Sequence, residues 1–128
     1  MSWQAYVDSS LIGSGKIDRA AIFSGTGDSQ WAASPGFSVG AEEIQSLVKG
    51  FNDAGSINTS GLYIDGENYR MVKAGDRSIY GRNEGKAGVL VVKTNKALIV
   101  AHYPETVQAQ EATQVVEQLA DYLIEIGY

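Results

Sequence analysis

A single histidine and a short glycine-rich segment are the residues that most directly suggest chemistry. His102 is the only histidine, so a Ser-His-Asp triad would have to be built on it. It ends an apolar stretch, where a buried histidine bonded to the backbone is the commoner arrangement. The segment "GSGK" at residues 13–16 resembles a phosphate-binding loop, but Ser10 and Ile17 stand where that loop needs a glycine and a Ser or Thr. We interpret this segment as a turn that ends a helix.

Other side chains do not complete a catalytic or metal-binding set. The chain has no cysteine, and one histidine alone makes zinc improbable. Asp65 and Glu67 flank Gly66, and this order is typical of a turn between two strands. We therefore predict no catalytic residue, no metal and no cofactor, so the chain is not expected to be an enzyme.

Aromatic residues form a more informative set. Trp3 and Tyr6 lie three residues apart and share one face of a predicted helix. Trp31 follows a polar turn, and Tyr122 and Tyr128 belong to the last helical segment. One interpretation is core packing, because each such ring buries about 150–250 Å². The other is an exposed aromatic strip that binds a polyproline helix, a ligand that is already extended and loses little entropy.

Composition and charge limit the class of protein. The 128 residues are 44% hydrophobic, which suits one globular domain, 1–128, and the net charge is −5. This acidic total argues against general nucleic-acid binding. Residues 61–104 nevertheless hold seven Lys and Arg against four Asp and Glu, which leaves room for one basic patch. The absence of cysteine, of a secretory signal and of a transmembrane segment predicts a soluble, cytoplasmic protein.

Hydrophobic spacing predicts helices at both ends and strands between them. The first helix should run from Ser2 to Gly13, and the last should begin near Thr106 with a buried stripe of Ala112, Val116, Leu119 and Leu123. A further helix is expected at 38–53. The expected strands lie at 16–24, 29–34, 61–64, 68–73, 77–82, 88–93 and 97–103. Because the connections are short, we predict an α+β fold with one antiparallel sheet and helices packed on its faces.

Several motifs of the chain resemble those of profilins of the fungal type. They are "SWQAYVD" at the start, "DSQWAAS" at 28–34, "RSIYGR" at 77–82, "AHYPETVQA" at 101–109 and "VEQLADYLIEIGY" at the end. The resemblance covers Ser2 to Tyr128. It implies a profilin-like fold with a single central antiparallel β-sheet, helices on both faces, and the N- and C-terminal helices together on one face.

The resemblance also implies a function. A profilin would bind monomeric actin, regulate its polymerisation, promote nucleotide exchange on actin and link monomers to proline-rich elongation factors such as formins. It would also bind phosphoinositide lipids and associate with the cytoskeleton. The implied polyproline contacts are Trp3, Tyr6, Trp31, Tyr122, Leu123 and Tyr128. The implied actin contacts are Lys73, Arg77, Arg82, Lys93, Gln108, Gln110, Glu111 and Gln114, and the implied lipid contacts are Lys73, Arg77 and Arg82.

Two positions depart from the pattern of the family. Gln110 stands where a glycine is common, and Gln114 stands where a lysine is common; both fall on the implied actin face. An alternative stays open, because fold alone does not decide function. A scaffold of related architecture would bind small GTPases or trafficking proteins and have no role with actin.

Overall fold

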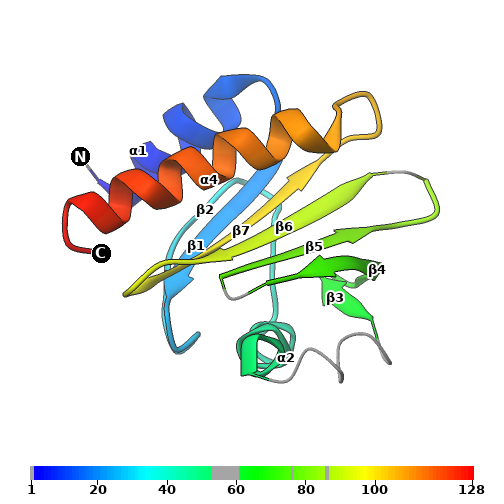
Figure 1. Ribbon diagram of the computed structural model, residues 1–128, viewed down its shortest axis with the longest axis horizontal. Coiled ribbons are helices and arrows are strands. Elements are labelled where there is room, and N and C mark those ends of the chain that lie inside the picture. Colours follow the sequence, from blue (N-terminus) through cyan, green and yellow to red (C-terminus); the bar gives the residue numbers. More distant parts are fainter. Residues whose placement is uncertain (1, 53–60, 76, 86) are drawn as a thin grey trace.

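The computed structural model describes residues 2–52, 61–75, 77–85 and 87–128. Strands make up most of the middle of the chain, one helix lies between the second and third of them, and helices lie at both ends (Figure 1). The helical segments are α1 (Trp3–Ala5), the π-helical η1 (Tyr6–Leu11), the 3₁₀ turn η2 (Ile12–Ser14), α2 (Ala41–Asn52) and α4 (Ala109–Glu125). The strands are β1 (Arg19–Ser24), β2 (Gln30–Ala33), β3 (Leu62–Ile64), β4 (Glu67–Ala74), β5 (Ser78–Arg82), β6 (Gly88–Lys93) and β7 (Ala97–Tyr103).

These strands form one seven-stranded sheet in the order β2-β1-β7-β6-β5-β4-β3. Every neighbouring pair is antiparallel, as the short connections predict. The first and last strands of the chain are neighbours in the sheet. β1 pairs along its whole length with β7, from Arg19 opposite His102 to Ser24 opposite Ala97. The predicted fold class is confirmed.

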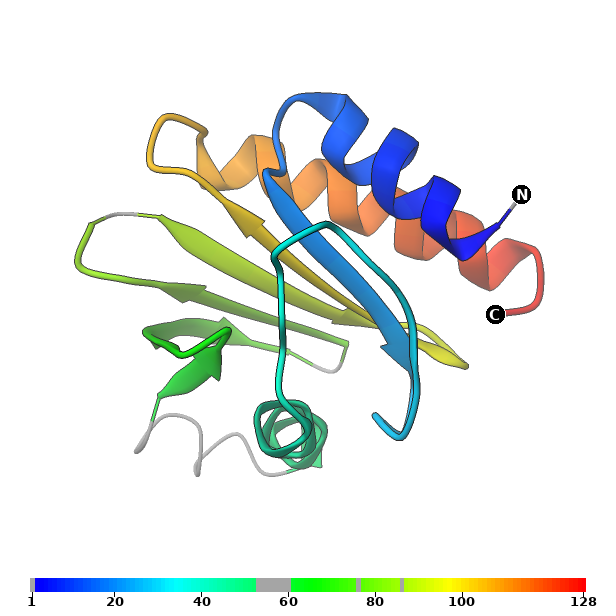
Figure 2. The same cartoon turned by 180° about the vertical axis from the view of Figure 1, so that it is seen from behind.

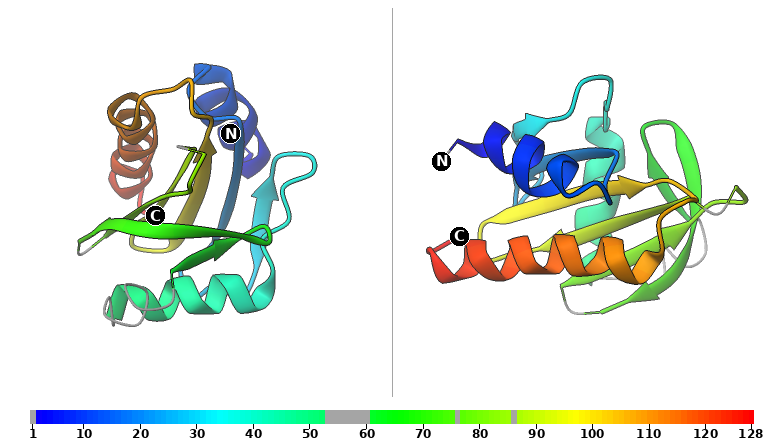
Figure 3. Two further views of the ribbon diagram at one scale, coloured as in Figure 1. Left: turned by 90° about the vertical axis from the view of Figure 1, so that its right-hand side faces the viewer. Right: turned by 90° about the horizontal axis from the view of Figure 1, so that it is seen from above.

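Helices cover both faces of the sheet, and each face has its own core. On one face, α1, η1 and α4 lie side by side over β1, β7 and β6 (Figures 2 and 3). On the other face, α2 packs with Ile44 and Leu47 against a second core. Successive residues of β6 serve the two cores in turn: Leu90 and Val92 face α4, and Val89 and Val91 face α2.

The first helical segment begins as predicted and ends later than predicted. The Ser2 hydroxyl caps it by accepting a hydrogen bond from the Ala5 N–H at 3.2 Å. The segment continues past Gly13 to Gly15, whose φ of +77° supplies the left-handed residue that ends a helix. Its π-helical turn lets Tyr6 and Leu11, five residues apart, both face the core.

The last helix begins later than predicted and buries the predicted stripe. Residues 104–107 form a turn in which the Val107 N–H bonds to the Pro104 carbonyl, so Gln108, rather than Thr106, is the extended residue that precedes α4. All four residues of the stripe, Ala112, Val116, Leu119 and Leu123, are buried. No helix of the described residues is long and apolar enough to cross a membrane.

A carboxylate in the middle of α4 ties this helix to β5. Glu117 accepts hydrogen bonds from the Arg77 guanidinium, from the Ser78 hydroxyl at 2.6 Å and from the Tyr80 hydroxyl at 3.0 Å. Arg77 also reaches Asp121 at 3.0 Å, one turn further along α4. The Glu117 side chain is 21% exposed, so its charge depends on these donors more than on water.

Replacement of Glu117 should therefore destabilise the fold. We expect Glu117→Ala to lower the free energy of unfolding by about 2 kcal/mol, because two hydroxyls and a guanidinium lose a partly buried acceptor. Urea denaturation measures this change. Glu125→Ala, at an exposed position of the same helix, is the matched control and should change stability little. Equal losses in the two variants would contradict a special role for Glu117.

Candidate functional site

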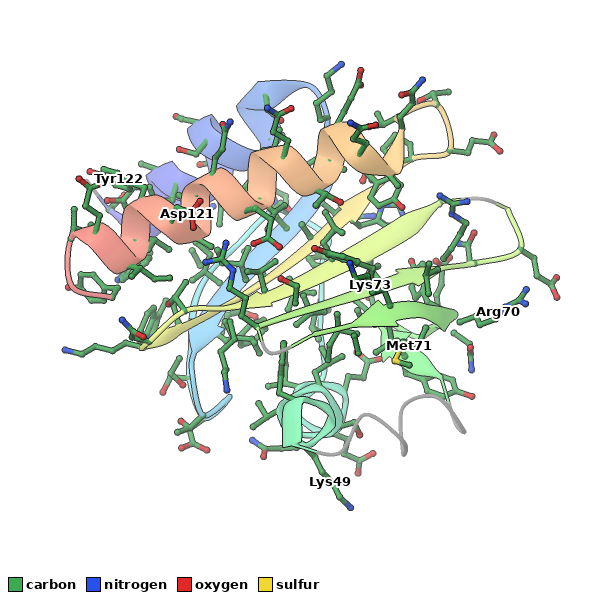
Figure 4. The ribbon with its side chains drawn as sticks, viewed as in Figure 1. Lys49, Arg70, Met71, Lys73, Asp121 and Tyr122 are labelled. Carbon is green, nitrogen blue, oxygen red and sulfur yellow. The ribbon has the colours of Figure 1, made fainter. Side chains whose placement is uncertain are left out.

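Five aromatic side chains, from the two ends of the chain and from β2, meet on one side of the molecule. We call Trp3, Tyr6, Trp31, Tyr122 and Tyr128 the aromatic cluster. The Trp3 ring is its centre, with ring centroids 4.6 Å from Trp31, 4.9 Å from Tyr128 and 5.6 Å from Tyr6. Tyr122 extends the cluster from α4, 6.1 Å from Tyr6 (Figure 4). The two terminal helical segments and β2 thus bring together the aromatic residues that the sequence singled out.

Members of the cluster differ in how much surface they offer. Tyr122 and Tyr128 are 47% and 38% exposed, and Trp3 and Trp31 are half-buried. Tyr6 is buried, and this burial raises the pKa of its hydroxyl, with nearby Tyr122 adding to the shift. The cluster therefore presents ring faces and polar tips together, which suits a ligand with apolar rings and free carbonyl groups.

Leu123 lies beneath the cluster rather than on it. Its side chain is fully buried in the core under α4, so it supports the neighbouring rings and offers no surface to a ligand. The α1 segment is also tied to the sheet, because the Gln4 amide donates to the Ala33 carbonyl of β2 at 2.9 Å. This bond holds α1 against β2, so that Trp3 lies beside Trp31, which is on β2 as Ala33 is.

A groove that the sequence did not indicate continues the aromatic cluster along the two helices. It lies between η1 and α4, and Tyr6 and Tyr122 belong to both the groove and the cluster. Its remaining lining residues are Ser10, Ser14, Val115, Gln118 and Leu119. Val115, Gln118 and Tyr122 recur at helical spacing, so this face of α4 was visible in the sequence once the helix was known.

Basic residues gather on a second surface, along β4 and β5 below α4. Tyr80 faces α4, where it bonds to Glu117, and Arg82 lies two residues further along β5 on the same face of the sheet. Lys73 pairs across the strands with Tyr80, and Arg70 pairs with Arg82, so these two residues of β4 lie on that face as well. Figure 4 labels Lys73 and Arg70 on β4. We call this surface, with the exposed residues at the start of α4, the second face. Gln108, Gln110, Glu111 and Gln114 are its residues on α4, all of them exposed.

Two of the predicted basic residues are placed differently from the rest. Lys93 lies on the opposite side of the sheet, with its ammonium 5.4 Å from the Phe51 ring of α2. Arg77 is on the second face, but its guanidinium is already paired with Glu117 and Asp121. Lys73 and Arg82 are the exposed basic residues among those predicted for this face.

Sequence reasoning missed an apolar residue on the second face. Val72 is 66% exposed, and it lines a small pocket with Tyr80, Arg82 and Thr113. A β-bulge between Met71 and Lys73 turns Val72 outward, while Met71 packs against the core beside α2. The alternation of apolar and polar residues breaks here, because Met71 and Val72 are both apolar, but the break alone does not show which of the two side chains turns outward.

The residues that first suggested chemistry have structural partners. The Arg19 guanidinium can only donate, so His102 Nε2 accepts from it at 3.0 Å and Nδ1 donates to the Asp18 carboxylate. His102 is therefore held by side chains, and not by the backbone as predicted. The "GSGK" segment is the helix-ending turn that was expected. Among the described residues, no group of three or more His, Asp or Glu side chains could hold a metal ion.

Comparisons with known proteins agree with this architecture. The profilin family model matches residues 1–128. Profilin of Saccharomyces cerevisiae is 52% identical over 128 residues, which cover 100% of both chains. The chain belongs to the profilin family. The solved structure of Schizosaccharomyces pombe profilin is 50% identical and has a TM-score of 0.94, covering 99% of this chain and 100% of the other.

A more distant structure shares the fold alone. Mouse Profilin IIa, solved in complex with a double repeat from the FH1 domain of mDia1, is 24% identical with a TM-score of 0.84 over 100% of both chains. Family membership indicates an actin-binding regulator, and it favours this reading over the scaffold with no role in actin biology. The resemblance seen in the sequence is confirmed.

Proposed function

We propose that this profilin binds monomeric actin through the second face and proline-rich segments through the aromatic cluster. The observation that carries the proposal is the cluster itself: four partly exposed rings lie together over the buried ring of Tyr6. Polyproline has apolar rings to stack on such a strip and carbonyl groups that accept from tyrosine and tryptophan donors. Mouse Profilin IIa, which binds an FH1 repeat, has the same fold.

The second face supports the actin half of the proposal. It combines exposed Lys73 and Arg82 with exposed Val72, and an apolar spot among charged residues is what a protein interface needs. The start of α4 borders this spot through Thr113. We propose that a monomer bound here exchanges its nucleotide faster and is passed to a proline-rich elongation factor held on the aromatic cluster. The protein would act in the cytoplasm, with the actin cytoskeleton.

Phosphoinositide headgroups are proposed as a third ligand, on the same basic residues. Lys73 and Arg82 are the better contacts, because a phosphate at Arg77 would have to displace Glu117 and Asp121. Arg70 joins Arg82 as its cross-strand neighbour. Two like charges placed opposite each other are unfavourable unless an anion binds them, so this pair is suited to a phosphate group.

Removal of the central ring should strongly weaken polyproline binding. We expect Trp3→Ala to weaken the affinity for a proline decamer by about 2 kcal/mol or more, because Trp3 contacts three other rings of the cluster. Titration followed by the fluorescence of Trp31 measures it, and circular dichroism checks the fold. Tyr63→Ala, at an exposed tyrosine of β3, is the control and should bind normally. Unchanged affinity in a folded Trp3→Ala protein would overturn the polyproline assignment.

Restoring the family pattern on α4 should strengthen actin binding. Gln110 and Gln114 lie four residues apart on one exposed face of the helix. A glycine at the first position allows closer approach of a partner, and a lysine at the second adds a cation for an acidic surface. We expect the Gln110→Gly, Gln114→Lys double variant to bind monomeric actin more tightly, with its polyproline affinity unchanged. Gln45→Lys, at an exposed position of α2 on the far side of the sheet, controls for the added charge. Tighter actin binding by Gln45→Lys, or no gain in actin affinity in the double variant, would refute this placement.

Lipid binding should depend on the exposed arginine pair and on salt. We expect Arg82→Glu to reduce co-sedimentation with phosphoinositide-containing vesicles, since each basic residue near an anionic surface contributes about 1 kcal/mol. Binding by the wild type should fall between low and physiological salt. Lys49→Glu, at an exposed position of α2, makes the same charge change away from the second face. Equal loss in both variants would show that net charge, and not this face, governs the interaction.

A further inference from the structure

The position of Tyr128 is fixed by its main chain as well as by its ring. After α4 the chain reverses at Gly127, which has a φ of +101°. The Tyr128 N–H bonds to the Leu123 carbonyl at 2.7 Å, and the Gly127 N–H bonds to the Ile124 carbonyl at 3.1 Å. This pair of hydrogen bonds is the Schellman motif, and it folds Tyr128 back toward the sheet.

The turn between β6 and β7 receives the folded-back residue. The Thr94 hydroxyl donates to the main-chain oxygen of Tyr128 at 2.8 Å, and the Lys96 N–H donates to the same oxygen. Thr94 is 6% exposed, and its hydroxyl oxygen also accepts from the Ala97 N–H at 3.0 Å. A hydroxyl has one proton, and the 3.4 Å contact with the Ala97 carbonyl is the weaker use of it. The Thr94 hydroxyl therefore donates its proton to the main-chain oxygen of Tyr128.

These contacts decide where one ring of the aromatic cluster lies. The Tyr128 ring stands edge-on to Trp3, at 4.9 Å and 88°, although the residue is 38% exposed. An exposed ring at a chain reversal would otherwise sample several positions, and ligand binding would have to select one of them.

We propose that Thr94 is a positioning residue for the aromatic cluster: its hydroxyl holds the main chain of Tyr128 so that this ring is in place before a ligand arrives. Thr94 itself touches no ligand, because it is buried in the turn. The proposal rests on the proposed polyproline function of the cluster. It makes the β6–β7 turn, which lies outside the helix pair, a determinant of affinity.

The test compares three threonine variants in the full chain. Thr94→Val removes the hydroxyl at nearly constant shape, and we expect it to weaken binding of a proline decamer about three- to tenfold. Thr94→Ser keeps the hydroxyl and should restore affinity to within about twofold of the wild type. Thr106→Val, at an exposed residue before α4, is the matched control and should bind as the wild type does. Actin-monomer binding should be the same in all of them.

A second readout separates the two proposals. The Trp3–Tyr128 contact contributes to the near-ultraviolet circular dichroism spectrum, which Thr94→Val should change and Thr94→Ser should not. If the wild type does not bind the proline decamer, the proposed function fails, and the spectrum still decides whether Thr94 positions the ring.

If Thr94→Val folds poorly, Gly127→Ala strains the left-handed reversal instead and should weaken binding likewise. Wild-type affinity and an unchanged spectrum in folded Thr94→Val would overturn the inference.

Discussion

The Glu117 carboxylate fixes α4 on the sheet, and both candidate faces depend on where this helix lies. Apolar burial along Ala112, Val116, Leu119 and Leu123 supplies the attraction between helix and sheet, but it would tolerate a small slide or rotation. Hydrogen bonds to Arg77, Ser78 and Tyr80 would be broken by such a movement. The hydrogen bonds of this partly buried carboxylate therefore favour one register of α4 on the sheet.

One rigid helix connects the two faces. The residues from Gln110 to Tyr122 span about 18 Å at 1.5 Å per residue. In the proposed function, this length would separate an actin monomer at the start of α4 from a peptide near its end. The two proposed sites keep a fixed spacing, because the helix between them is anchored at Glu117.

Local features of this fold could be predicted from the sequence, whereas long-range features could not. Alternating β-branched residues and turn residues located the strands, and the i, i+3, i+4 stripe located α4 and the burial of Leu123. The same stripe conflicts with Leu123 as a ligand contact, and the structure places its side chain in the core. Helix ends were wrong by a few residues because Gly15 and Gln108, rather than Gly13 and Thr106, adopt the conformations that end and begin a helix.

The basic residues show where sequence reasoning reached its limit. Residues 88–92 of β6 are buried on both faces, so nothing in the alternation indicates that Lys93 turns toward α2. The partner of Arg77 lies 40 residues away, and only the packing of α4 against β5 brings the two charges together. Both residues read as free cations in the sequence.

Pairing within the fold therefore decides which charges remain for partners. The strands hold an excess of Lys and Arg, but several of these side chains already have partners within the fold. Arg77 pairs with Glu117 of α4, Arg19 contacts His102 and Asp65, and Lys93 lies over the ring of Phe51. Lys73, Arg70 and Arg82 stay exposed, and all three face the same side. The positive field of these three residues has a short range, because acidic residues lie close by. Residues 105–128 hold five of them, including the two on α4 that pair with Arg77. An acidic protein can thus present a small basic surface, which attracts an anionic partner at short range while the net charge of −5 repels such partners at a distance.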